Sequence, residues 1–314
     1  MKISELAAYR ETLESLKLTQ SETVLTGEMD AAIYFVKNNS IAESITASAL
    51  EISRKCAIDA VQDFNDHVDK ILAGLLQEIQ TLEPAYLSRS YHLYHAASMH
   101  DSVDTILNRR LSMDAAMQSH IQSRVQAHSD YHHAGMIIRP GLEHWIEHMV
   151  ACDPLYIVDT SHDLFRPVKE KFNDQYQARL RYYAIRESSE RPMLAALPNN
   201  QFGFVLAYNF FHYKPFEIMR AYLQEIYQKL RPGGILGITF NDCDRQGAVR
   251  LAEQMANCYT PGRLVIAACE SAGFVIEQND RIDAAVNWVE MRKPGHMASL
   301  RGGQTLAKIV AKSK

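Results

Sequence analysis

The stretch FVLAYNFFHYKPFEIMRAYLQEIYQKLRPGGILGITF, residues 204–240, decides the fold of this chain. It opens with a short continuous apolar run, residues 204–207, which is typical of a strand buried on both faces. Apolar residues then recur at helical spacing, at Ile218, Tyr222, Leu223, Ile226 and Leu230. The Pro-Gly-Gly at 232–234 predicts the end of that helix, and residues 235–240 again have the pattern of a strand. The order strand, helix, strand predicts a βαβ unit of a parallel sheet.

Strand and helix patterns on both sides extend this unit into a larger domain. From about residue 134 to 293 the alternation predicts an α/β fold with a doubly wound, mostly parallel sheet. The further expected strands are residues 135–138, 155–159 and 182–185, an entry to a sixth strand at 272–275, and an antiparallel strand at 286–291. The first helix of the sheet is expected at residues 144–150.

The amino-acid sequence of these segments resembles that of the class I S-adenosylmethionine (SAM)-dependent methyltransferase family, in which LRPGG commonly precedes a hydrophobic strand. The resemblance covers roughly residues 110 to 293. It implies a Rossmann-like methyltransferase fold, SAM as the cofactor, and methyl transfer to an acceptor that the sequence does not name.

The resemblance also implies cofactor-binding positions. The turn after the first strand would carry Arg139, Gly141 and Glu143, and Asp159 would end the second strand, where an acid can accept the ribose hydroxyls. The family's turn resembles G-x-G-x-G, whereas only Gly141 is a glycine here. A cation near a sulfonium is unfavourable by Coulomb repulsion, so we predict that Arg139 pairs with Asp159 and fills the site.

Candidate catalytic residues follow the fourth strand, on the loop that faces a cofactor in the family's layout. They are Tyr208, Asn209 and His212, which could orient an acceptor or take its proton. No metal site is expected, because His144 and His148 are four apart but lack the HExxH pattern that a zinc helix requires.

The region before the sheet has a helical pattern with few breakers. A heptad-like seam runs through Ile45, Ala49, Ile52 and Cys56, and continues after a five-residue step through Val61, Phe64, Val68, Ile71 and Leu75. A coiled coil that joins subunits and an intramolecular helical bundle both produce such a seam. We therefore expect residues 1–110 to be an all-helical, partly coiled-coil oligomerisation region, residues 111–293 the α/β domain, and residues 294–314 a basic tail.

Composition limits the functional classes. The formal net charge of −4 gives no overall signal for nucleic-acid binding, and no apolar run reaches membrane-spanning length. Five widely spaced cysteines indicate reduced thiols, as in the cytoplasm. Two functions stay open: a SAM-dependent methyltransferase assembled through its helices, and a catalytically inactive methyltransferase-like scaffold that binds protein partners, for example a bacteriophage virion component.

Overall fold

The computed structural model describes residues 2–19, 44–96, 115–140, 144–187 and 191–296. The chain forms two compact units, Met1–Pro84 and Ala85–Lys314, and the division falls inside one long helix. Among the sequence predictions, the turn residues Gly141 and Glu143 and most of the tail 294–314 lie outside the described residues.

Within its described residues the first unit is helical, as the sequence predicts. It contains α1 (Ile3–Thr19) and the larger part of α3 (Ser44–His95), which an ion pair of 2.6 Å joins between Lys17 and Asp69. Along the predicted seam, Val68 is buried, whereas Phe64 and Ile71 are each 41% exposed. The seam is therefore only partly packed within the chain, and the coiled coil stays a prediction.

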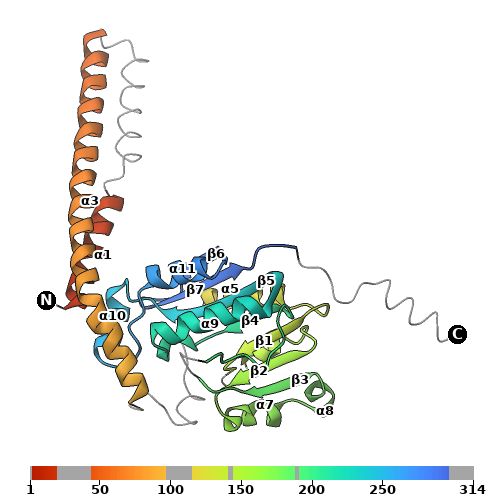
Figure 1. Ribbon diagram of the computed structural model, residues 1–314. Helices are drawn as coiled ribbons and strands as arrows, with labels where there is room; N and C mark the ends of the chain where they lie inside the picture. The colour runs from red at the N-terminus through yellow and green to blue at the C-terminus, as the bar shows by residue number, and fades with distance from the viewer. Residues whose placement is uncertain (1, 20–43, 97–114, 141–143, 188–190, 297–314) are drawn as a thin grey trace. The chain divides into compact units, whose positions relative to one another are not determined.

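The second unit is built on a seven-stranded sheet in the order β3-β2-β1-β4-β5-β7-β6 (Figure 1). The strands are β1 (Ala134–Ile138), β2 (Leu155–Asp159), β3 (Leu180–Ala184), β4 (Phe202–Ala207), β5 (Leu230–Asn241), β6 (Val275–Arg281) and β7 (Val286–Arg292). Neighbours from β3 to β5 are parallel, and β7 runs antiparallel to both β5 and β6. The predicted mostly parallel sheet with an antiparallel strand at 286–291 is confirmed.

Helices cover both faces of the sheet, because right-handed crossovers that run toward β3 and those that run toward β5 lie on opposite faces. The helices of this unit are α5 (Ala115–His128), α6 (His144–His148), η1 (His162–Phe165), α7 (Arg166–Lys171), α8 (Asp174–Gln177), η2 (Phe211–Tyr213), α9 (Phe216–Lys229), α10 (Gln246–Glu253) and α11 (Gly262–Ser271). On one face Leu236 and Ile238 of β5 share a core with α9 and α11. On the other face Glu290 of β7 binds Arg124 of α5.

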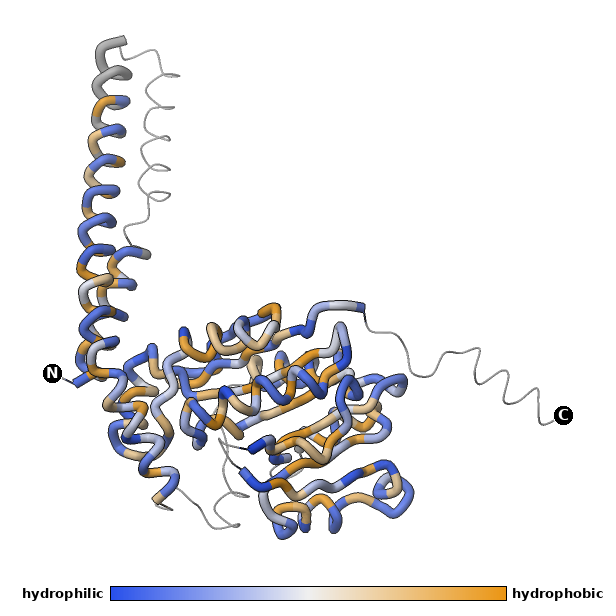
Figure 2. The backbone as a smooth tube through the Cα atoms, in the orientation of Figure 1, coloured by the Kyte–Doolittle hydropathy of each residue, from blue (hydrophilic) through white to orange (hydrophobic). Residues whose placement is uncertain are grey.

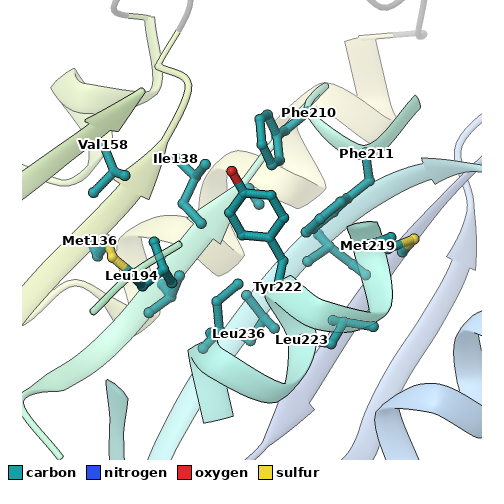
Figure 3. Close-up of a cluster of buried hydrophobic side chains, with 14 of the residues drawn as sticks. Met136, Ile138, Val158, Leu194, Phe210, Phe211, Met219, Tyr222, Leu223 and Leu236 are labelled. Carbon is teal, nitrogen blue, oxygen red and sulfur yellow. The ribbon is translucent and has the colours of Figure 1, made fainter. Parts of the chain in front are cut away.

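The apolar residues that the sequence places in strands form this core. Figure 2 shows hydrophobic positions recurring along the strands of the sheet. Tyr222 of α9 is fully buried in the cluster, and Figure 3 shows its hydroxyl directed toward Phe210 and Ile138 at the carboxyl ends of the strands. The Tyr222 hydroxyl is therefore a polar group of the core that points toward the carboxyl edge of the sheet.

Several predicted boundaries were wrong in detail. Helix α9 ends at Lys229 rather than at Pro232, because Leu230 already pairs with Phe202 of β4 as the first residue of β5. The Pro-Gly-Gly turn lies within β5, where Gly233 has a φ of 81° and its N–H donates to Lys293 O. Strand β3 begins two residues earlier than expected, and α6 ends two residues earlier.

Candidate functional site

The carboxyl edge of the sheet gathers the polar residues of the second unit. From β1 the chain proceeds to β2 and β3 on one side, and it returns to β4 on the other side. Ligands of open α/β sheets bind at such a switch point. The ends of these strands bring Arg139, Asp159, Glu187 and the loop 208–214 to this edge.

Arg139 and Asp159 form a buried ion pair there, as the sequence predicts. The Arg139 Nη2 atom lies 3.0 Å from Asp159 Oδ1, and the two side chains are 9% and 1% exposed. The same Oδ1 accepts hydrogen bonds from the backbone N–H of Thr160 at 2.7 Å and, at 3.2 Å, from Arg139 Nε. Burial alone would lower the pKa of Arg139, but the Asp159 carboxylate raises it above its ordinary value. The guanidinium is thus held on the acid that would accept ribose hydroxyls.

The backbone at Arg139 keeps the conformation of a glycine turn. Its φ is 55°, in the left-handed region that favours glycine. A non-glycine residue there is strained, so Arg139 occupies a backbone position that favours glycine.

A second buried ion pair lies beside the first. Lys214 Nζ is 2.6 Å from Glu187 Oε2, and it also donates to the Tyr94 hydroxyl at 3.2 Å. The Tyr94 hydroxyl donates to the same carboxylate oxygen, and the Tyr222 hydroxyl donates to Glu187 Oε1 at 3.0 Å. Burial would raise the pKa of Glu187, but the charge of Lys214 lowers it below its ordinary value. Burial lowers the pKa of Lys214.

One aromatic ring links the two pairs. The Arg139 guanidinium lies 5.1 Å and the Lys214 ammonium 5.0 Å from the centroid of the Phe210 ring. Two cations and two carboxylates therefore form one charge-balanced cluster at the switch point. Sequence reasoning missed Lys214, Glu187 and Tyr94, because their partners are distant in the chain and no local pattern connects them.

The predicted catalytic residues lie on the β4 and β5 side of the same edge. Thr239 Oγ1 of β5 accepts the backbone N–H of Asn209 at 2.7 Å and lies 3.2 Å from His212 Nε2. The Tyr208 ring is 4.5 Å from Trp145, and burial raises the pKa of the Tyr208 hydroxyl, which therefore stays protonated near neutral pH. Asn209 and His212 thus meet at Thr239, and the neighbouring Tyr208 ring packs at a tilt against Trp145 of α6.

Asn209 is the predicted catalytic residue with an open hydrogen-bonding position. Its Oδ1 atom is buried without a hydrogen-bond partner in the described structure, and its φ is 51°. A buried acceptor of this kind fits a donor group on a ligand.

The arrangement of the edge does not fit SAM. The Asp159 carboxylate, which the sequence predicts as the ribose acceptor, is covered by the Arg139 guanidinium. The sulfonium is a cation, and the edge already contains two buried cations, Arg139 and Lys214, each neutralised by its own carboxylate. Within the described residues no group of three His, Cys, Asp or Glu side chains could hold a metal ion.

Comparison with solved structures returns methyltransferases among its matches. An N-methyltransferase, NodS, from Bradyrhizobium japonicum in complex with S-adenosyl-L-homocysteine is 14% identical, with 63% of this chain and 99% of that chain covered and a TM-score of 0.46. A SAM-dependent methyltransferase from Mesorhizobium loti is 13% identical, covering 54% and 96%, with a TM-score of 0.42. A possible exported protein from Bordetella parapertussis is 15% identical, covering 58% and 69%, with a TM-score of 0.44.

No curated protein matches the chain in sequence. A family model described as "Methyltransferase domain" matches residues 143–238, which extend from the turn after β1 into β5. The match thus includes Asp159 and the loop 208–214 but begins after Arg139. The predicted doubly wound sheet is confirmed around these residues, and this part of the chain matches a methyltransferase domain.

Proposed function

We propose that this chain uses its methyltransferase domain as a binding and assembly module, without SAM-dependent catalysis. The observation that carries the proposal is the buried ion pair between Arg139 and Asp159. A cofactor would have to displace the guanidinium from the carboxylate and leave a cation close to its own sulfonium. Both steps are unfavourable, since an unpaired buried charge and a repulsion between like charges at short range each cost free energy.

A SAM-dependent methyltransferase with an unknown acceptor is the competing function. The unpartnered Oδ1 atom of Asn209 favours it, because this atom lies after β4, where the family places its acceptor loop. Under this alternative Asp159 would bind the cofactor after Arg139 had moved away, and Asn209 would orient the acceptor.

The helical first unit supplies the assembly part of the proposal. Phe64 and Ile71 of α3 are seven residues apart and half-exposed, and Ile52 is 65% exposed on the same helix. Apolar residues at heptad spacing favour pairing with another helix, so we propose self-association through this seam. No helix of the described chain is long and apolar enough to cross a membrane. The module would act in the cytoplasm, or in a virion if a phage encodes it.

Calorimetric titration of the full chain with SAM and with S-adenosylhomocysteine tests the proposal. We expect no binding of either compound, because Asp159 is engaged by Arg139, and SAM is disfavoured further because Arg139 and Lys214 repel its sulfonium. Binding of SAM with a Kd on the order of micromolar, about −8 kcal/mol, would overturn the proposal and establish the enzyme as the better account.

A further inference from the structure

The Lys214 ammonium lies in surroundings that differ from those of an ordinary buried lysine. Besides its ion pair with Glu187, it lies 5.1 Å from the centroid of the Tyr94 ring and 5.0 Å from that of Phe210. Its side chain is 5% exposed. The ammonium therefore has a carboxylate and two aromatic rings around it and almost no water.

Separate parts of the second unit build these surroundings. Tyr94 comes from the last turn of α3, Glu187 from the segment after β3, and Phe210 from the loop after β4. The hydroxyls of Tyr94 and Tyr222 donate to different oxygens of Glu187 and fix the orientation of the carboxylate. The partners of the ammonium are thus held in place by the fold and not by Lys214 alone.

Lys229 provides a comparison within the same domain. It is also buried, at 5% exposure, but its ammonium donates to the backbone oxygen of Leu197 and to Asn199 Oδ1. These partners are neutral oxygens, whereas aromatic faces combined with a carboxylate are the groups with which proteins hold organic cations. Lys214 therefore occupies a site with the chemistry of a cation receptor.

We infer that Tyr94, Glu187 and Phe210 form a binding site for an organic cation of the alkylammonium or sulfonium class, which the chain fills with its own Lys214 ammonium. The inference extends the proposed function, because a site occupied by Lys214 has no room for the charge of a sulfonium cofactor. If Lys214 is removed, Glu187 keeps its tyrosine donors but loses its cation. The cluster then carries a net negative charge, which attracts a free cation of matching size.

Chemical rescue of Lys214→Ala tests this inference. The substitution removes three methylene groups and the ammonium, which n-propylammonium replaces in size and charge. Thermal unfolding of Lys214→Ala is measured in n-propylammonium chloride, in 1-propanol and in sodium chloride of equal ionic strength. We expect the melting temperature to rise with n-propylammonium concentration only, because a ligand that binds the folded state alone stabilises it.

Two further variants make the test specific. Lys229→Ala removes an equally buried lysine whose hydrogen-bond partners are neutral oxygens, and n-propylammonium should not raise its melting temperature above the effect of sodium chloride. Lys214→Met combined with Glu187→Gln removes both charges of the pair, should fold, and should not respond either. Should Lys214→Ala be unfolded in plain buffer, refolding in n-propylammonium but not in 1-propanol is the expected result.

The inference is overturned if n-propylammonium stabilises or refolds Lys214→Ala no better than 1-propanol or sodium chloride does. Equal rescue of Lys229→Ala would also contradict it, since the carboxylate and rings would then contribute nothing. These outcomes are independent of SAM titration of the unmodified chain. The rescue experiment can therefore refute the cation site while the proposed function remains supported, and SAM titration can refute the proposed function while the cation site remains supported.

Discussion

The Arg139 guanidinium lies 3.0 Å from the Asp159 carboxylate, and these residues directly follow β1 and end β2, two parallel neighbours in the sheet. In dinucleotide sites of α/β sheets, the turn after the first strand carries glycine and an acid that binds the ribose follows about 20 residues later. Arg139 lies in the corresponding turn here, and Asp159 corresponds to the acid. The Arg139 side chain thus places a cation in the turn and also occupies the carboxylate that a nucleotide would need.

Restoring the turn should restore cofactor binding. In Arg139→Gly combined with Glu143→Gly, Asp159 is released and the left-handed φ of residue 139 becomes unstrained. We expect the double variant to bind SAM at least about tenfold more tightly than the unmodified chain, which corresponds to roughly 1.4 kcal/mol. Calorimetry measures the difference.

Two controls belong to this experiment. Arg139→Lys keeps the cation and should gain no affinity, and Asp159→Ala in the restored background should weaken binding again. If the unmodified chain binds SAM strongly and the glycine variant binds less, Arg139 is a ligand contact. If neither binds, the glycine turn is not what prevents binding, and Lys214 becomes the next position to change.

Tyr94 should stabilise the domain through its hydroxyl. In Tyr94→Phe the ring remains, but Glu187 and Lys214 each lose a hydrogen bond in a buried place. We expect the free energy of unfolding to fall by about 1–3 kcal/mol. Urea denaturation measures it, with Tyr91→Phe on the same helix as the matched control, expected within about 0.5 kcal/mol of the parent. Equal losses in both variants would contradict the prediction.

Glu290 should make the domain sensitive to acid. Burial alone would raise its pKa, but hydrogen bonds from Arg124, His128 and Trp288 lower it from 4.5 to about 2. Since the folded pKa is below the unfolded one, the unfolded chain binds the proton first as the pH falls. The stabilisation, on the order of 3 kcal/mol, is complete above about pH 5 and is lost as the pH falls through the folded pKa.

Urea denaturation at several pH values in this range measures the effect. Glu290→Gln is the control, because an amide does not titrate, and its stability should depend less on pH than that of the parent. A slope of stability against pH that is unchanged in Glu290→Gln would assign the acid sensitivity to other carboxylates.

The seam on α3 should join copies of the chain. Phe64→Asp combined with Ile71→Asp places charges in the apolar contact, where an unpaired charge is strongly unfavourable. Sedimentation velocity should show a smaller species whose α/β domain is still folded. Gln62→Asp with Gln80→Asp adds the same charge at exposed polar positions of α3 and should leave the mass unchanged. A mass unaffected by the seam substitutions at low concentration would exclude this contact.

The sheet could be predicted from the sequence where strands are continuous apolar runs. Strand β2 at Leu155–Asp159 agrees with the prediction at both ends, because its apolar residues are followed at once by an acid and a turn. The predicted position of strand β3 was wrong, because the strand is half-exposed and its apolar pattern is therefore weak. The end of α9 was misplaced because Leu230 pairs with Phe202, a contact that local helical periodicity cannot indicate.

The site could be predicted only in part, for a related reason. The ends of adjacent parallel strands meet, so the pairing of Arg139 with Asp159 followed from the strand assignment alone. The contacts of Lys214 with Glu187 and Tyr94 bridge 27 and 120 positions and join a loop to another segment and to the last turn of α3. Such contacts depend on the tertiary arrangement of elements, about which the spacing of residues carries no information.

The ring of Phe210, with a cation of each buried pair near it, has an evolutionary consequence. Loss of one member of a buried pair costs about 3–5 kcal/mol, whereas loss of both members is often neutral. Single reversions toward a glycine turn therefore pass through less stable proteins, and their effects depend on one another because the residues share partners. Replacement of either buried pair is therefore expected to require that both of its members change together.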